Sequence, residues 1–121
     1  MEGVRSVKDV MVLMVTEGNL FPSMWGATAP AGVGSGFGPE MERLGAMSKS
    51  EIMAEMEKSF EHLIASCRDM SEADHMTERS WFGTQMTAAA VISAASGDMH
   101  EHLGQSIAYA RTNHIVPPWS M

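Results

Sequence analysis

Three stretches of the chain carry apolar residues at spacings of three and four, which is the pattern of a helix with one buried face. The first stretch follows Ser6, a residue type that caps helix starts. It ends near Gly18-Asn19, a pair that favours a C-terminal stop. We therefore expect the first helix over residues 6–18.

The other two stretches have equally clear limits. Ser48 and Glu51 have the spacing of a capping box, so a second helix is expected over residues 48–68. The third stretch contains no proline and is rich in alanine, which predicts a long helix over residues 87–112.

The segments between these helices carry turn-forming residues. Residues 20–47 contain three prolines and a run of glycines, so we expect one long loop there. The motif Ser71 to Asp74 can start a helix, but the apolar pattern fades at once and predicts a single short turn. Residues 80–86 are expected to form an extended segment or a hairpin-like connector.

These elements indicate a single all-α domain over residues 1–121. Three amphipathic helices leave a bundle one wall short, because four helices are the usual closed arrangement. A second copy of the chain can supply that wall, in a two-fold dimer or by exchange of helices. The sequence therefore predicts a homodimer.

Composition narrows the possible partners. The chain has 121 residues, and 45% of them are hydrophobic, so we expect it to fold. Its net charge of -7 disfavours nucleic acid and anionic membrane surfaces as partners. No apolar run approaches the roughly 20 residues of a membrane span, and the first residues lack the order of a signal peptide. The single cysteine, Cys67, cannot form an internal disulfide, and we expect it to be a thiol of the core. These features predict a cytoplasmic protein.

One patch of the third helix can carry chemistry. Asp98 and His102 lie four residues apart, so both side chains project from the same surface and can chelate a divalent cation. His100 and Glu101 point to other sides of the helix. A metal ion would need a third ligand from another helix or chain, and a solvated Asp/His pair without metal explains the spacing equally well.

The remaining polar residues offer less. Gln105 and Tyr109 extend the polar stripe and can orient a ligand or bond water. His62 has no acidic or histidine neighbour at helical spacing, and we expect both His62 and His75 at the surface. His114 follows the end of the third helix.

Two segments of the chain resemble the DinB-like family. The run from His100 to Trp119 is similar to the C-terminal signature of that family, and the run from Val4 to Val10, followed by Phe21-Pro22-Ser23, resembles its second helix and the loop after it. Together with the Phe82-Gly83 connector, the likeness covers nearly the whole chain.

The resemblance implies a fold and an activity. Members are up-down-down-up four-helix bundles related to the bacillithiol- and mycothiol-dependent S-transferases, and they are commonly dimeric. Three histidines hold a nickel- or zinc-type ion, one from the second helix and two from the last. Here the first of the four helices has no counterpart, which agrees with the open wall.

The family's three ligand positions are only partly kept. The last histidine matches His102, the one before it falls on Asp98, and the second-helix one falls on Leu13. Leu13 cannot bind a metal, and Glu17, one turn further along, is the nearest substitute. The resemblance thus implies an altered site made of Glu17, Asp98 and His102.

Two functions follow, and the sequence leaves the choice between them open. The first is a metal-dependent thiol S-transferase or hydrolase relative that uses Ni, Zn or Mn and a small thiol. The second is a non-catalytic helical oligomer, or a protein that binds a small apolar molecule, which has lost the metal.

Overall fold

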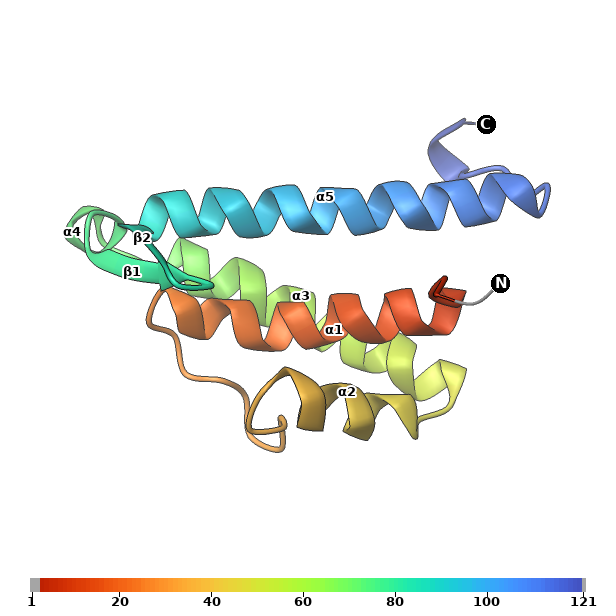
Figure 1. The fold of residues 1–121 in the computed structure, drawn as a ribbon, viewed down its shortest axis with the longest axis horizontal. Coiled ribbons are helices and arrows are strands. Elements are labelled where there is room, and N and C mark those ends of the chain that lie inside the picture. Colours follow the sequence, from red (N-terminus) through yellow and green to blue (C-terminus); the bar gives the residue numbers. More distant parts are fainter. Residues whose placement is uncertain (1–2, 121) are drawn as a thin grey trace.

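A computed structural model describes residues 3–120 of the chain. This part contains five α-helices, a two-stranded hairpin and a short 3-10 helix (Figure 1). The helices are α1 (Val7–Met24), α2 (Phe37–Gly45), α3 (Lys49–Arg68), α4 (Glu72–His75) and α5 (Ala88–Thr112). The strands are β1 (Glu78–Trp81) and β2 (Thr84–Thr87), and the 3-10 helix is η1 (Pro118–Ser120).

The three long helices lie roughly along the long axis of the molecule, with α3 inclined to the other two (Figure 1). α1 lies among the other helices. The chain runs one way along α1, returns along α2 and repeats the first direction in α3, so α1 and α3 are parallel. The hairpin then reverses the chain into α5, which runs antiparallel to both. α1 packs against α2, α3 and α5, whereas α3 and α5 hardly contact each other. The all-α prediction is correct in outline, with a small antiparallel sheet added.

The capping signals predict the helix starts well. Ser6, Ser48 and Ser71 each accept a hydrogen bond from the amide three residues on and form a capping box with the acidic residue there. α3 and α5 lie within a residue of their predicted limits, and the predicted turn and hairpin are confirmed as α4 and as β1 with β2.

The predicted end of the first helix is wrong, because α1 continues past Gly18-Asn19 to Met24. Gly18 lies where α1 meets α3: a Cβ atom added to it would lie 2.9 Å from Ser59 Oγ. The absence of a side chain at Gly18 therefore allows α1 and α3 to approach closely. Asn19 likewise makes a tertiary contact, because its Nδ2 donates to Glu40 Oε1 over 2.9 Å.

The predicted loop over residues 20–47 is also wrong, since it contains the last turn of α1 and all of α2. The fully buried Glu40 of α2 accepts four hydrogen bonds, from Asn19 Nδ2, the Gly34 amide, and Nε and Nη2 of Arg43. Burial by itself would raise the pKa of Glu40, but the hydrogen bonds from Arg43, Gly34 and Asn19 outweigh it and lower that pKa. This carboxylate ties the glycine-rich loop to α1 and α2.

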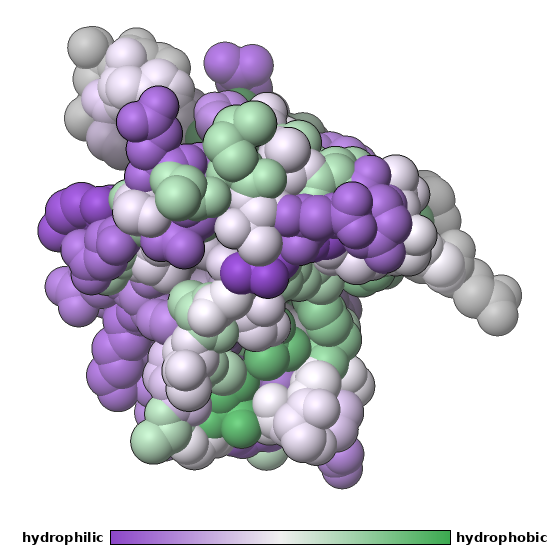
Figure 2. Space-filling view, turned by 90° about the vertical axis from the view of Figure 1, so that its left-hand side faces the viewer, coloured by the Kyte–Doolittle hydropathy of each residue, from purple (hydrophilic) through white to green (hydrophobic). Residues whose placement is uncertain are grey.

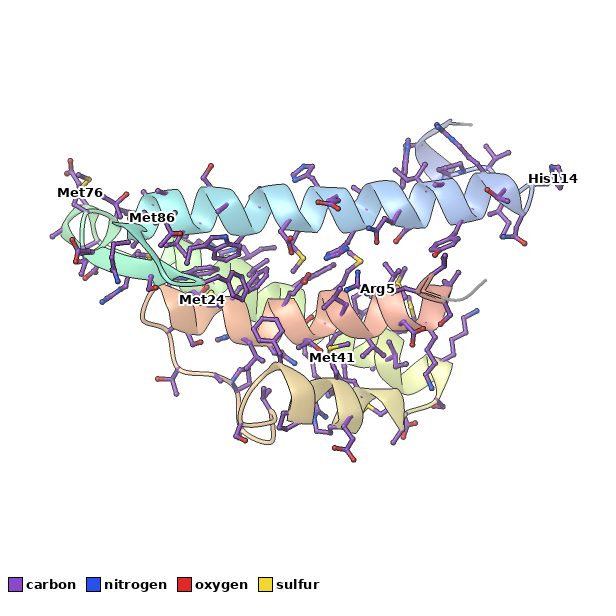
Figure 3. The ribbon with its side chains drawn as sticks, in the orientation of Figure 1. Arg5, Met24, Met41, Met76, Met86 and His114 are labelled. Atoms are coloured by element: carbon purple, nitrogen blue, oxygen red, sulfur yellow. The ribbon has the colours of Figure 1, made fainter. Side chains whose placement is uncertain are left out.

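Two apolar clusters form the core, one at each end of α1. The first contains Phe21, Trp25, Ala88, Val91 and Ala95, and the second contains Val12, Val15, Leu44 and Ile52. Methionines fill space around both, with Met41 between α1 and α2 and with Met24 and Met86 near the hairpin (Figure 3). Cys67 is half-buried against the first cluster, and burial raises the pKa of its thiol, as expected of a core cysteine.

The hairpin closes one end of the bundle. Its two turn residues, Phe82 and Gly83, both have positive φ angles, of 45° and 91°, as a two-residue hairpin turn requires. The ring of Phe82 contacts those of Trp81, Phe21 and Phe37. Seen from this end, polar residues cover most of the upper surface and a strongly apolar patch shows below them (Figure 2).

None of the helices within residues 3–120 has both the length and the apolar character needed to cross a bilayer.

The Gly18 contact makes a direct prediction. Gly18→Ala is expected to lower the free energy of unfolding by about 1–3 kcal/mol, because the new methyl group overpacks against Ser59. Chemical denaturation measures the loss, and the loss should be smaller when Gly18→Ala is made in a chain that already carries Ser59→Gly.

Gly97→Ala is the matched control for this substitution. A Cβ at Gly97 meets no atom within 4 Å, so this change should raise stability by up to about 1 kcal/mol through helix propensity. Equal effects of the two substitutions would contradict close packing at Gly18.

Candidate metal centre

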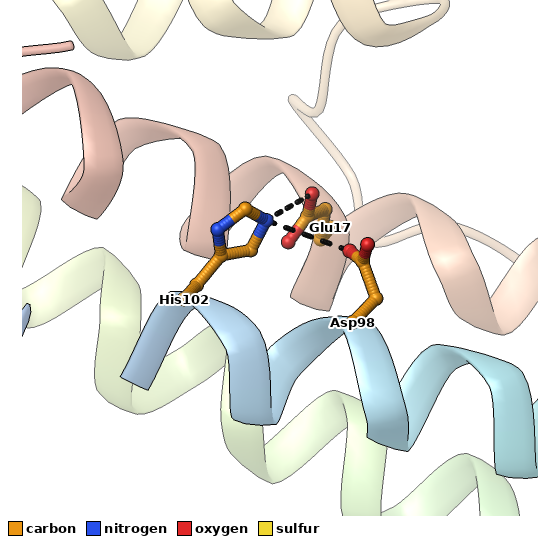
Figure 4. A group of neighbouring side chains, drawn as sticks. All are labelled: Glu17, Asp98 and His102. Carbon is orange, nitrogen blue, oxygen red and sulfur yellow. Dashed lines mark hydrogen bonds and ion pairs between the residues drawn. The ribbon is translucent and has the colours of Figure 1, made fainter. Parts of the chain in front are cut away.

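Two helices from opposite ends of the chain bring three ligand-type side chains together. Glu17 projects from the middle of α1, and Asp98 and His102 project from one face of α5 toward it (Figure 4). Since α5 is regular, the four-residue spacing alone places Asp98 and His102 side by side. The antiparallel packing of α5 on α1 adds Glu17.

The three side chains meet at coordinating range. His102 Nε2 lies 3.2 Å from Glu17 Oε1 and 3.5 Å from Asp98 Oδ2. One ligand atom from each residue lies within 4.8 Å of the other two. Glu17 and His102 are 4% and 5% exposed, whereas the side chain of Asp98 is 36% exposed. The centre is therefore buried on two sides and reaches solvent past Asp98.

Gln105 orients the imidazole of His102. Its Oε1 lies 3.2 Å from His102 Nδ1, one turn further along α5. When Nδ1 carries the proton and donates it to Gln105, Nε2 has a free lone pair directed at the two carboxylates. This is the orientation that a metal-binding histidine needs.

The electrostatics of Glu17 are unfavourable for a lone carboxylate. Burial raises its pKa to about 7, the charge of Asp98 adds to the rise, and His102 opposes it. The second oxygen, Oε2, is buried without a hydrogen-bond partner among residues 3–120. Two carboxyl groups and an imidazole nitrogen thus face one another, and all of them are acceptors when the carboxyl groups are ionised and Nε2 carries no proton. A divalent cation would satisfy all three groups, so the donor set fits a metal ion.

The structure places the other predicted residues outside this group. Leu13 is buried one turn before Glu17 and offers no donor atom. His100 is exposed, with Nδ1 2.7 Å from the Ser96 carbonyl oxygen, and Glu101 is exposed as well. The hydroxyl group of Tyr109 donates to the carbonyl oxygen of Arg5 at the start of α1.

Two histidines differ from their predicted positions. His62 was expected at the surface, but it is half-buried and its Nε2 has no hydrogen-bond partner among the described residues. The periodicity of α3 does not reveal this burial, because the loop between α1 and α2 provides the cover. His75 is half-buried too, and His114 is exposed just after α5.

Comparison of the chain with protein-family models, with curated proteins and with solved structures finds no match. The site is therefore interpreted from its own geometry.

The raised pKa of Glu17 predicts how stability depends on pH in metal-free protein. The folded state keeps Glu17 protonated, whereas the unfolded chain ionises it above its ordinary value of 4.5. Stability contributed by the protonated group is therefore fully present below pH 4.5 and is lost as pH rises to about 7. Denaturation with a chelator present should show this decline in the wild type and not in Glu17→Gln; identical pH profiles would contradict the raised pKa.

Proposed function

We propose that this protein binds a divalent metal ion through Glu17, Asp98 and His102 and is a DinB-type relative of the metal-dependent thiol S-transferases and hydrolases. The observation that carries the proposal is the convergence of three ligand atoms within 4.8 Å, two of them on buried side chains. A buried carboxyl whose pKa is raised, beside a second carboxylate, costs stability unless a cation compensates it.

The chain topology supports the DinB part of the proposal. α1, α3 and α5 run down, down and up, the order of the last three helices in an up-down-down-up bundle. Glu17 lies on the helix that corresponds to the family's second one, a turn beyond Leu13, and α5 corresponds to the last. Asp98 stands in place of one histidine, and Glu17 lies one turn beyond the position of another, so the donor set is richer in oxygen than three histidines and more favourable to Mn²⁺.

The proposed chemistry is attack of a small thiol or of water on an electrophile. A bound divalent ion lowers the pKa of such a nucleophile. Gln105 holds the imidazole in place, and Glu17 would hold the ion as a carboxylate. Asp98, whose side chain is 36% exposed, is the ligand group that reaches solvent.

Metal binding is tested by thermal denaturation. Zn²⁺, Mn²⁺ or Ni²⁺ at a hundred times its Kd should raise the Tm by roughly 10 °C. His102→Ala should abolish the shift, and the matched change His100→Ala should keep it, because His100 lies outside the group. Binding should weaken as the pH falls, since protonated imidazole cannot coordinate.

Two results would contradict the proposal. The first is a Tm unaffected by all three ions, supported by elemental analysis that finds no metal in the purified protein. The second is a shift that His102→Ala and His100→Ala reduce equally, which would indicate non-specific binding.

A second candidate function is a non-catalytic helical oligomer, and one observation favours it. α3 and α5 both pack on α1 without closing on each other, and an apolar cavity of about 250 Å³ lies between them. Ile64 on α3 and Leu103 on α5, neither of which lines this cavity, are 54% and 41% exposed. A homodimer that buries this open face would complete the bundle, and a small apolar molecule would fill part of the same space.

The oligomer is tested by light scattering. The wild type should have the mass of a dimer, and Leu103→Lys with Ile64→Lys should shift it to monomer by placing charges in the interface. Met76→Lys is the control, since Met76 is 68% exposed next to α4 and away from this face. A wild-type monomer at all concentrations would rule out this assembly.

A further inference from the structure

A groove lies between the first turns of α1 and α3, which start at the same end of the bundle (Figure 1). Its volume is about 300 Å³. We call it the α1/α3 groove, and its walls are Val7, Lys8 and Met11 of α1 with Lys49, Ile52 and Met53 of α3. None of the three residues of the proposed metal centre lines it, so the two places are separate.

The floor and the rim of this groove are apolar. Ile52 is buried, and Met11 packs against the same core cluster. Val7 and Met53 lie at the rim and are 49% and 50% exposed. Apolar side chains on both sides of an apolar floor offer a short hydrocarbon chain a place out of water.

Two cations and no carboxylate belong to the same walls. Lys8 Nζ donates to the carbonyl oxygens of Gly45 and Met47 over 2.8 and 3.0 Å. These bonds hold the ammonium group in place, but they leave its charge without an anion among residues 3–120 and its third N–H free. The exposed side chain of Lys49 has no ion pair within the same residues.

The acidic residues nearest along the chain are used elsewhere. The carboxylates of Asp9 and Glu51 accept hydrogen bonds from Ser6 and Ser48 in the capping boxes. The two lysines lie in the first turns of their helices, where the helix dipole is positive too and disfavours a cation. The α1/α3 groove is therefore locally positive in a chain whose net charge is -7.

The larger cavity of the molecule has a different charge pattern. It lies under the glycine-rich loop beside His62 and has a volume of about 520 Å³. Its two cations, Arg43 and Lys58, are both paired with carboxylates. Unpaired cations beside an apolar floor are thus a property of the α1/α3 groove, and they match a ligand with an anionic head and a hydrocarbon tail.

We propose that the α1/α3 groove binds a small aliphatic carboxylate, whose anionic head faces the ammonium groups of Lys8 and Lys49 while its hydrocarbon chain lies on Ile52 between Val7 and Met53.

The proposal is tested with sodium hexanoate as the probe, and with 1-hexanol and hexylammonium chloride as analogues that keep the chain and change the charge. Titration of ¹⁵N-labelled protein with hexanoate at pH 7 and constant ionic strength should give saturable amide shifts confined to the starts of α1 and α3 and to residues 45–47. 1-Hexanol should bind about fivefold more weakly, because it lacks the charge that two exposed lysines attract. Hexylammonium, which they repel, should bind more weakly still.

Two variants separate the contribution of the charge from that of the apolar wall. Lys49→Gln should weaken hexanoate binding by about threefold and leave 1-hexanol binding unchanged, because only the charge is lost. Met53→Ser should weaken the binding of both compounds by about threefold, because both use the apolar wall. Both residues are exposed, so both variants should fold.

Lys58→Gln and Met76→Ser are the matched controls. They make the same chemical changes at exposed residues outside the α1/α3 groove, so the affinity for hexanoate should stay as in the wild type. His102→Ala should also bind hexanoate normally, so failure of the metal centre and failure of this groove can be distinguished.

Three outcomes would overturn the proposal. Shifts that rise linearly with hexanoate and never saturate would show that there is no site. Equal affinities for hexanoate and hexylammonium would show that the groove does not recognise charge. Equal losses in Lys49→Gln and Lys58→Gln would reduce the binding to general attraction by surface lysines.

Discussion

The packing of α1 against three neighbours at once is the constraint on which the rest of this structure depends. Three successive residues of α1 each face a different element. Glu17 contacts His102 of α5, Gly18 lies against Ser59 of α3, and Asn19 donates to Glu40 of α2. Successive helical residues point about 100° apart, so a fully enclosed helix can serve three partners within one turn. A change in the rotation of α1 would disrupt all three contacts together.

Two buried carboxyl groups on this framework have opposite environments. Arg43 compensates Glu40, whose pKa falls in spite of burial, and the result is a structural anchor for the loop. Burial raises the pKa of Glu17 to about 7, the Asp98 carboxylate raises it further, and the imidazole of His102 only partly opposes the rise. A carboxyl held in such an environment is a common sign of a functional site, because nothing in the packing requires it. The contrast within one small domain is why we assign a structural role to Glu40 and propose a ligand role for Glu17.

The arrangement also leaves one face of the bundle open. α3 and α5 lie on either side of α1, and apolar side chains of both line the space between them. The polar cavity under the glycine-rich loop lies on the other side of α3 and has acceptors among its walls. The two spaces differ in their lining, because one presents apolar side chains and the other presents charged and polar ones.

Local signals in the sequence determined the capped starts of α1 and α3, the length of α5, the hairpin and the Asp98/His102 pair. Each depends on residues within a few positions of one another, where helix and turn geometry leave little choice. The end of α1 was missed because glycine and asparagine are common residues where helices end. Only the tertiary contacts show the role of this pair: Gly18 lies against Ser59, and Asn19 donates to Glu40. Glu17 could be suggested as a ligand only through the family resemblance. Its position 3.2 Å from His102, its raised pKa and the cavity beside His62 were decided by the tertiary structure, because they depend on how distant segments pack and exclude water.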